Sequence, residues 1–90
     1  MNGTYTHMAA NATKAITTAS AVLMGVIINT KGASSNTLTI YDGTAATGTV
    51  VAVIDTTSIV TQLEYGCTCV NGVTAVMATG TAADVTIVTN

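Results

Sequence analysis

The sequence predicts an all-β protein, a small antiparallel β-sandwich of jelly-roll-like form with about seven or eight short strands. The first observation is composition, because 38 of the 90 residues are Thr, Val or Ile, which favour the pleated, half-buried surface of a strand. The second is punctuation, since Gly and Asn interrupt the chain at short intervals, as turns between strands require. The third is length, since 90 residues make one domain.

Residues 1–13 are polar and weakly patterned, and they are expected to form an N-terminal arm or a short edge strand. The sandwich domain is then expected to occupy residues 14–90, with a first strand over 14–18. If the segment is an arm, its candidate contact residues are Tyr5, His7 and Met8. Arms of this kind order only on binding, so we expect its deletion to leave the sandwich folded.

Residues 21–29 are apolar on both faces of a predicted strand, which is typical of a strand buried on both sides. Gly25 within this run indicates a bulge or a close backbone approach. Counted by simple alternation, one face carries Val22, Met24, Val26 and Ile28, and the other carries Leu23 and Ile27.

Residues 36–41 alternate, with Leu38 and Ile40 on the inward face. Asp42 and Gly43 form a turn signal that opens the loop 42–48, with Asp42 capping its own backbone before a glycine of positive φ. Further strands are expected over 49–54, 59–65 and, after Gly66, over 67–70.

Asn71 and Gly72 separate two apolar runs and predict a two-residue β-hairpin between residues 70 and 73. The last two strands are expected over 73–79 and 84–89.

Charge and hydropathy exclude several partners. The chain carries only two basic residues and a net charge of −2, so it offers no basic surface for nucleic acid or an anionic membrane. Its longest apolar run, residues 21–28, is too short for the ~20 residues of a membrane helix. The first residues lack the pattern of a signal peptide, so we expect a soluble chain made in a cytoplasm.

The scarcity of charge points to assembly. Charged residues make up 7% of the chain, whereas the design norm for a soluble monomer is a surface with roughly 25–35% charged residues. Strands with few charges and no proline also lack the usual protection of sheet edges. We therefore expect other protein copies to cover much of the surface, and the isolated chain to elute as a trimer.

From residue 23 onward the chain resembles a small virion protein of tailed bacteriophages. The resemblance covers roughly three quarters of the chain and rests on turn and strand segments. It is sharpest at Thr37-Leu38-Thr39-Ile40-Tyr41-Asp42-Gly43 and continues through residues 25–30, 48–55, 63–66, 71–73 and 83–88. It implies a β-sandwich, commonly trimeric, of the capsid-decoration or fibre-associated type.

No constellation of residues indicates catalysis, a cofactor or a metal. The side-chain acids are expected beside turns and strand ends, where solvation is the default, and not as an acid–base pair. Cys67 and Cys69 lie two apart without a second cysteine pair, which suits neither a mutual disulfide nor a zinc site. His7, the only imidazole, has no sequence signature of a triad. The acids are Asp42, Asp55, Glu64 and Asp84.

The expected function is therefore that of a structural virion protein, a decoration or cement protein that binds the major capsid protein as a homotrimer and stabilises the phage head. The alternative is a tail, neck or fibre module that contacts another virion protein or the host surface. A small enzyme is the third hypothesis, and no residue pattern supports it.

Overall fold

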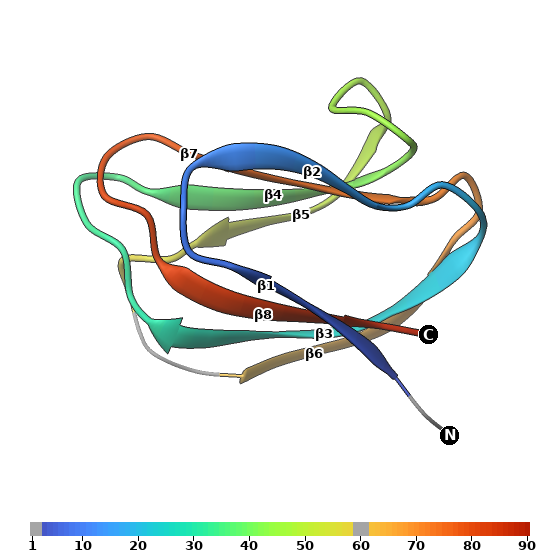
Figure 1. Cartoon of the computed structure of the whole chain (residues 1–90), viewed down its shortest axis with the longest axis horizontal. Helices are drawn as coiled ribbons and strands as arrows, with labels where there is room; N and C mark the ends of the chain where they lie inside the picture. Colours follow the sequence, from blue (N-terminus) through green and yellow to red (C-terminus); the bar gives the residue numbers. More distant parts are fainter. Residues whose placement is uncertain (1–2, 59–61) are drawn as a thin grey trace.

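The structure, a computed structural model, describes residues 3–58 and 62–90 (Figure 1). These residues form eight strands and no helix, which confirms the predicted small β-sandwich. The strands are β1 (Thr4–Met8), β2 (Ala12–Thr17), β3 (Ala21–Thr30), β4 (Thr37–Asp42), β5 (Thr49–Asp55), β6 (Gln62–Cys69), β7 (Val73–Ala78) and β8 (Asp84–Thr89).

The strands form two antiparallel sheets of four. Sheet A has the order β1-β8-β3-β6 and sheet B the order β2-β7-β4-β5. Strand β1 therefore pairs with β8, β2 with β7, β3 with β6, and β4 with β5. This is the pairing of one long hairpin, with its tip between β4 and β5, that has been rolled up into two layers. The connectivity is that of a jelly roll.

The core lies between the sheets and is built from medium-sized aliphatic side chains. In β4 the alternation predicted from the sequence is observed, because Leu38 and Ile40 are fully buried, and β8 buries Val85 and Ile87 in the same alternating way. No aromatic side chain is buried among the described residues. Each core residue therefore contributes less buried apolar area than a Phe or Trp would.

The predicted irregularity at Gly25 is confirmed, because the pairing of β3 shifts between Leu23 and Gly25 against both of its neighbours. A Cβ atom at Gly25 would lie 2.9 Å from the carbonyl oxygen of Leu63. The bulge changes which side chains face the core: Leu23, Val26 and Ile28 are buried, while Val22, Met24 and Ile27 are half-buried on the outer face. The prediction of a strand buried on both sides is wrong, because the described chain places no layer over this outer face.

The N-terminal segment is an edge strand where the structure describes it, and the alternative of a flexible arm is wrong for residues 4–8. Residues 4–8 form β1 and pair with β8 without interruption. Residues 12 and 13 already belong to β2, so the expected boundary between residues 13 and 14 falls inside a strand. Deleting residues 1–13 would remove one strand and shorten another, so the sandwich would not stay intact.

The predicted hairpin at Asn71–Gly72 is wrong. Strands β6 and β7 do not pair, because β6 lies in sheet A and β7 in sheet B, and the turn carries the chain from one sheet to the other. The two short strands expected around Gly66 are one strand, β6, which contains Gly66 at a φ of 95°. The expected strand start at residues 59–61 lies outside the described residues.

One end of the sandwich is organised by the fully buried side chain of Asn36, and we call its hydrogen bonds the Asn36 network. The Asn36 amide donates to Asn11 Oδ1 and to the carbonyl oxygens of Ala78 and Thr79 at 2.9–3.2 Å. Its Oδ1 atom accepts from the Thr56 hydroxyl and from the backbone N–H of residue 83. One side chain thus joins the loops β1–β2, β3–β4, β5–β6 and β7–β8.

Candidate functional site

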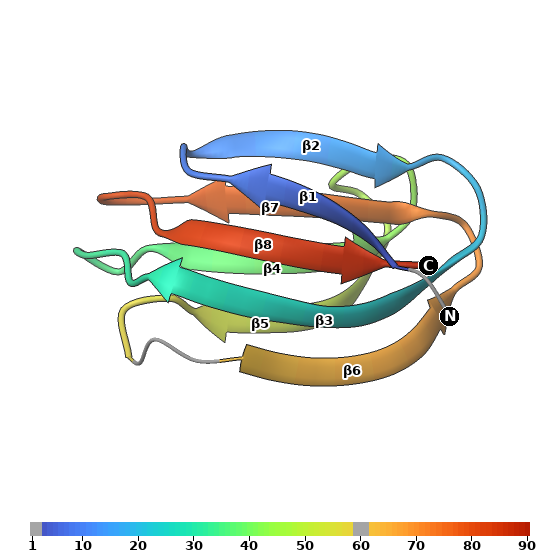
Figure 2. The same ribbon diagram turned by 60° about the horizontal axis from the view of Figure 1, so that its bottom comes forward.

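The two long edges of the sandwich are its candidate interaction site. Figure 2 shows β1 and β2 along one side of the molecule and β5 and β6 along the opposite side. We call these the β1/β2 edge and the β5/β6 edge. Edge strands present unpaired backbone N–H and C=O groups and are ready to pair with another chain.

The large apolar side chains that are exposed in the described residues lie at these edges and in the turn after β6. Tyr5 in β1 is 74% exposed, Val53 in β5 is 66% exposed, and Tyr65 in β6 is 38% exposed. Val50 in β5 and Val70 in the turn are also exposed. None of them lies on an inner strand. Neither Val50 nor Val53 was predicted as a contact residue, although the continuous apolar run of β5 in an edge position would have indicated them.

Three of the four edge strands are partly protected against pairing by bulges. The register shifts place an extra residue on β2, on β5 and on β6. Bulges twist an edge and hinder regular strand addition. The sequence had suggested bare edges throughout. Among the four edge strands of the described chain only β1 is regular, with five consecutive pairs to β8 and no shift.

The three residues named for the N-terminal arm have three different environments. Tyr5 is exposed, Met8 is buried in the core at 5% exposure, and the His7 side chain contacts β8. Met8 is therefore a core residue and not a contact residue. Tyr5 remains a candidate contact residue, now on a strand edge.

His7 belongs to a polar cluster on the outer face of sheet A. Its Nε2 atom lies 2.7 Å from Asp84 Oδ1, and the Asn29 amide donates to the same carboxylate and to Thr86 Oγ1. The hydrogen bond from Asn29 first, and that from His7 second, lower the pKa of Asp84. The His7–Asp84 contact is solvent-exposed, so its contribution to stability is small. The cluster fastens β1 to β8 and β3.

The four predicted turn residues meet at the other end of the sandwich, but their roles differ from the prediction. Asp42 Oδ1 accepts a hydrogen bond from the backbone N–H of Asn71 at 2.8 Å, so it caps the neighbouring turn and not its own. Gly43 donates its N–H to the carbonyl oxygen of Gly72. Gly72 has a φ of 126°, whereas Gly43 is not among the residues of positive φ. The two predicted turns therefore support each other at the end of sheet B, where Asp42 of β4 is paired with Val73 of β7.

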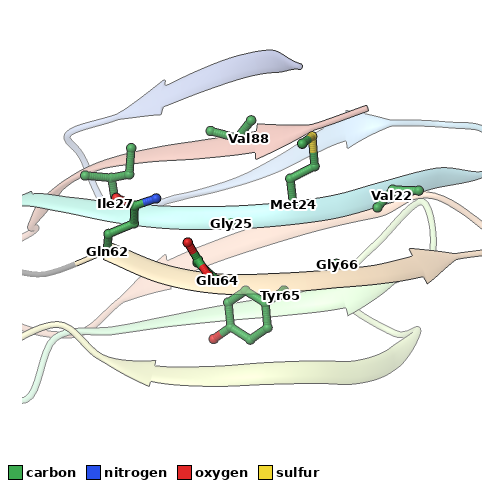
Figure 3. A pocket seen from close by; sticks show the side chains of 9 residues that line it. All are labelled: Val22, Met24, Gly25, Ile27, Gln62, Glu64, Tyr65, Gly66 and Val88. Atoms are coloured by element: carbon green, nitrogen blue, oxygen red, sulfur yellow. The ribbon is translucent and has the colours of Figure 1, made fainter. Parts of the chain in front are cut away.

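Two of the surface hollows differ clearly in their lining. An apolar groove of about 500 Å³ runs along the outer face of sheet A, where Val22, Met24, Ile27 and Val88 line it beside Glu64 (Figure 3). A polar hollow of about 400 Å³ lies in the β4–β5 loop, lined by Asp42, Thr44, Thr47 and Asn71 among others.

The cysteines are structural in position. Cys69 is fully buried and Cys67 is half-buried, and both are free. Burial raises the pKa of the Cys69 thiol, which disfavours the reactive thiolate. No three His, Cys, Asp or Glu side chains gather at one place in the described residues.

Comparison with known proteins gives no relative, because no family model, curated protein or solved structure matches this chain. A helix able to span a membrane is also absent from the part of the chain that the structure describes.

Proposed function

We propose that this chain is a structural virion protein, a capsid decoration or cement protein that binds the phage head as a homo-oligomer. A trimer is the expected form. The observation that carries the proposal is the concentration of exposed Tyr5, Val50, Val53 and Tyr65 on edge strands. Soluble monomers usually place charges at such positions, and here another protein copy would cover them.

The charge content supports the same proposal. Six charged side chains serve the whole chain, and one of them, Asp84, is held by His7 and Asn29. A protein that works inside a symmetric shell needs little charge of its own, because neighbouring subunits cover its surface. The mechanism is mechanical: copies bridge neighbouring capsid subunits and oppose their separation.

The jelly-roll connectivity agrees with this role at the level of analogy. The same fold is used by viral capsid domains and also by lectins and cupins, and a fold alone does not fix a function. The resemblance of the chain from residue 23 onward to phage virion proteins favours the first of these uses. It implies the major capsid protein as the partner and the capsid surface as the location.

The polar hollow in the β4–β5 loop favours a second candidate function, a tail, neck or fibre module that contacts the host surface. Its carboxylate, amide and hydroxyl groups come from Asp42, Asn71, Thr44 and Thr47. Such groups suit the hydroxyls of a sugar. The hollow has no aromatic side chain among its lining residues, whereas aromatic rings commonly form the platform of sugar sites.

The copy number in purified phage particles tests the proposal and separates the two candidates. Quantitative mass spectrometry would measure this chain relative to the major capsid protein of particles that contain it. A ratio near one to one supports decoration of the whole shell, and a ratio of a few per cent supports the tail or neck. Absence from particles would overturn both.

A further inference from the structure

We infer that copies of this chain associate head to tail, with the β1/β2 edge of one copy against the β5/β6 edge of the next, and that the contacts close into a ring. This inference rests on the homo-oligomer of the proposed function and adds which surfaces meet. It follows from the charges, the apolar side chains and the symmetry that the two edges permit.

The two edges carry opposite charge. Lys14 is exposed on β2, where it pairs with Ala75 of the neighbouring strand. Glu64 is exposed on β6, and Asp55 ends β5. Within the described residues the one salt-bridge contact is His7–Asp84, so Lys14 and Glu64 have no ionic partner among them.

The remaining charged residues do not change this polarity. Lys31 and Asp42 lie at the ends of the sandwich, in or beside the loops β3–β4 and β4–β5. Asp84 lies on the inner strand β8, where its carboxylate is hydrogen-bonded to the side chains of His7 and Asn29.

Both edges also carry the apolar side chains that a contact would bury. Tyr5 projects from β1, and Val53 and Tyr65 are exposed on β5 and β6. Aromatic residues are enriched at the centres of interfaces, and opposite charges around them set orientation and register. At the β5/β6 edge Val53 and Tyr65 line one hollow together with Asp55, and at the β1/β2 edge Lys14 lines a hollow with His7 and Met8.

Symmetry then decides between two kinds of assembly. A two-fold dimer brings each edge against a copy of itself, so Lys14 would approach Lys14, or Glu64 would approach Glu64. A head-to-tail contact brings unlike edges together, and its repetition closes into a ring when the rotation permits. The opposite charges of the two edges favour the head-to-tail contact, and the form expected here is a closed ring of three copies of the chain.

Reversing the charges tests the inference. We would compare the wild-type chain with Lys14→Glu, with Glu64→Lys and with the variant that carries both changes, using sedimentation velocity and native mass spectrometry at low salt. Each single change should weaken association at least about tenfold, because like charges then face each other. The double change should restore association, because the two charges are exchanged and still attract.

Lys31→Glu is the matched control, because it alters net charge as Lys14→Glu does but lies at an end of the sandwich. It should leave association unchanged. Thermal unfolding of every variant would show that the fold is kept.

A mixture of wild-type chain and isotopically labelled double variant gives a second readout. Every mixed contact would place two lysines or two glutamates together, so the two chains should form separate oligomers. Free mixing of the two chains, or double variants as weak as the single ones, would overturn the inference.

The outcomes separate this inference from the proposed function. If none of these substitutions changes the oligomer, the head-to-tail pairing is wrong and the homo-oligomer of the proposed function still holds. A wild-type chain that stays monomeric at high micromolar concentration removes both the pairing and the homo-oligomer.

Discussion

At the end of the sandwich that contains the Asn36 network, which we call the loop end, buried polar atoms form hydrogen bonds within one chain. Along the edges, large apolar side chains lie in solvent. The Asn36 network gives a partner to every donor and acceptor it buries, and no buried side-chain N or O atom in the described residues lacks one. At the edges, Tyr5 and Val53 contact little of their own chain. The difference teaches that the buried polar groups of the loop end are satisfied within one copy, whereas the edges keep apolar surface that the proposed contact with a second copy would bury.

The largest expected effect is at the loop end. Asn36→Ala removes a fully buried side chain that makes five hydrogen bonds. It leaves the N–H of residue 83 and two carbonyl groups without this hydrogen-bond partner. We expect a loss of about 3 kcal/mol or more in the free energy of unfolding, measured by chemical denaturation. Asn29→Ala, the same change at the surface, should cost about 1 kcal/mol or less. Equal losses would remove the special role of Asn36.

The next effect is at the edges and concerns association. Tyr5→Thr and Val53→Thr keep the β propensity of their strands and remove exposed apolar surface. Each should weaken self-association about tenfold and change the unfolding free energy of the monomer by less than about 0.5 kcal/mol. Val76→Thr is the matched control, since Val76 lies on the inner strand β7. If Val53→Thr and Val76→Thr weaken association equally, the edges are not the contact.

A smaller effect tests the backbone of the loop end. Thr79 has a φ of 73°, which is strained for a β-branched residue, and its carbonyl oxygen accepts a hydrogen bond from Asn36. Asn tolerates this conformation, so Thr79→Asn should stabilise the fold by about 0.5–1 kcal/mol. The same change at Thr81, whose φ is not positive, should give no gain. A destabilised Thr79→Asn variant would show that the Thr side chain is needed.

The smallest effect concerns pH. The hydrogen bonds from Asn29 and His7 lower the folded-state pKa of Asp84 below its ordinary value of 3.8. Asp84 therefore stabilises the fold above that value, and this contribution is lost as the pH falls through the lowered pKa. Between pH 6 and pH 2 the melting temperature of the wild type should fall more than that of Asp84→Asn. Identical pH profiles would show that the cluster contributes nothing.

The sequence predicted the elements that depend on local pattern. Strands β4, β5, β7 and β8 lie within about one residue of their predicted bounds, because alternation and flanking turn residues are local signals. The bulge at Gly25 was also predicted, since a glycine inside an apolar strand has few other uses.

The predictions that failed depend on which strands pair over long distances. Asn71–Gly72 has the local signal of a hairpin, but β6 pairs with β3 and β7 pairs with β4. The N-terminal segment is weakly patterned because β1 is an edge strand, and only its pairing with β8, about 80 residues away in the sequence, identifies it.

The sequence could suggest that surfaces are covered, but it could not locate them, and the contact itself stays a prediction. Composition indicated covered surfaces, and Tyr5 was named as a contact residue. Tyr5 and Lys14 lie on the strands of one edge, and Val53 and Glu64 on those of the other, only because of which strands become edges. Asn36 was not singled out, because a buried asparagine looks like any turn residue in the sequence.

The mass of the purified wild-type chain in solution tests the central claim most directly, since that claim is that its edges are covered by further copies. Light scattering coupled to size exclusion would measure it over a range of micromolar concentrations. The expected result is a closed species of three times the chain mass of 9.0 kDa. A single species of 9.0 kDa at every concentration would contradict the claim.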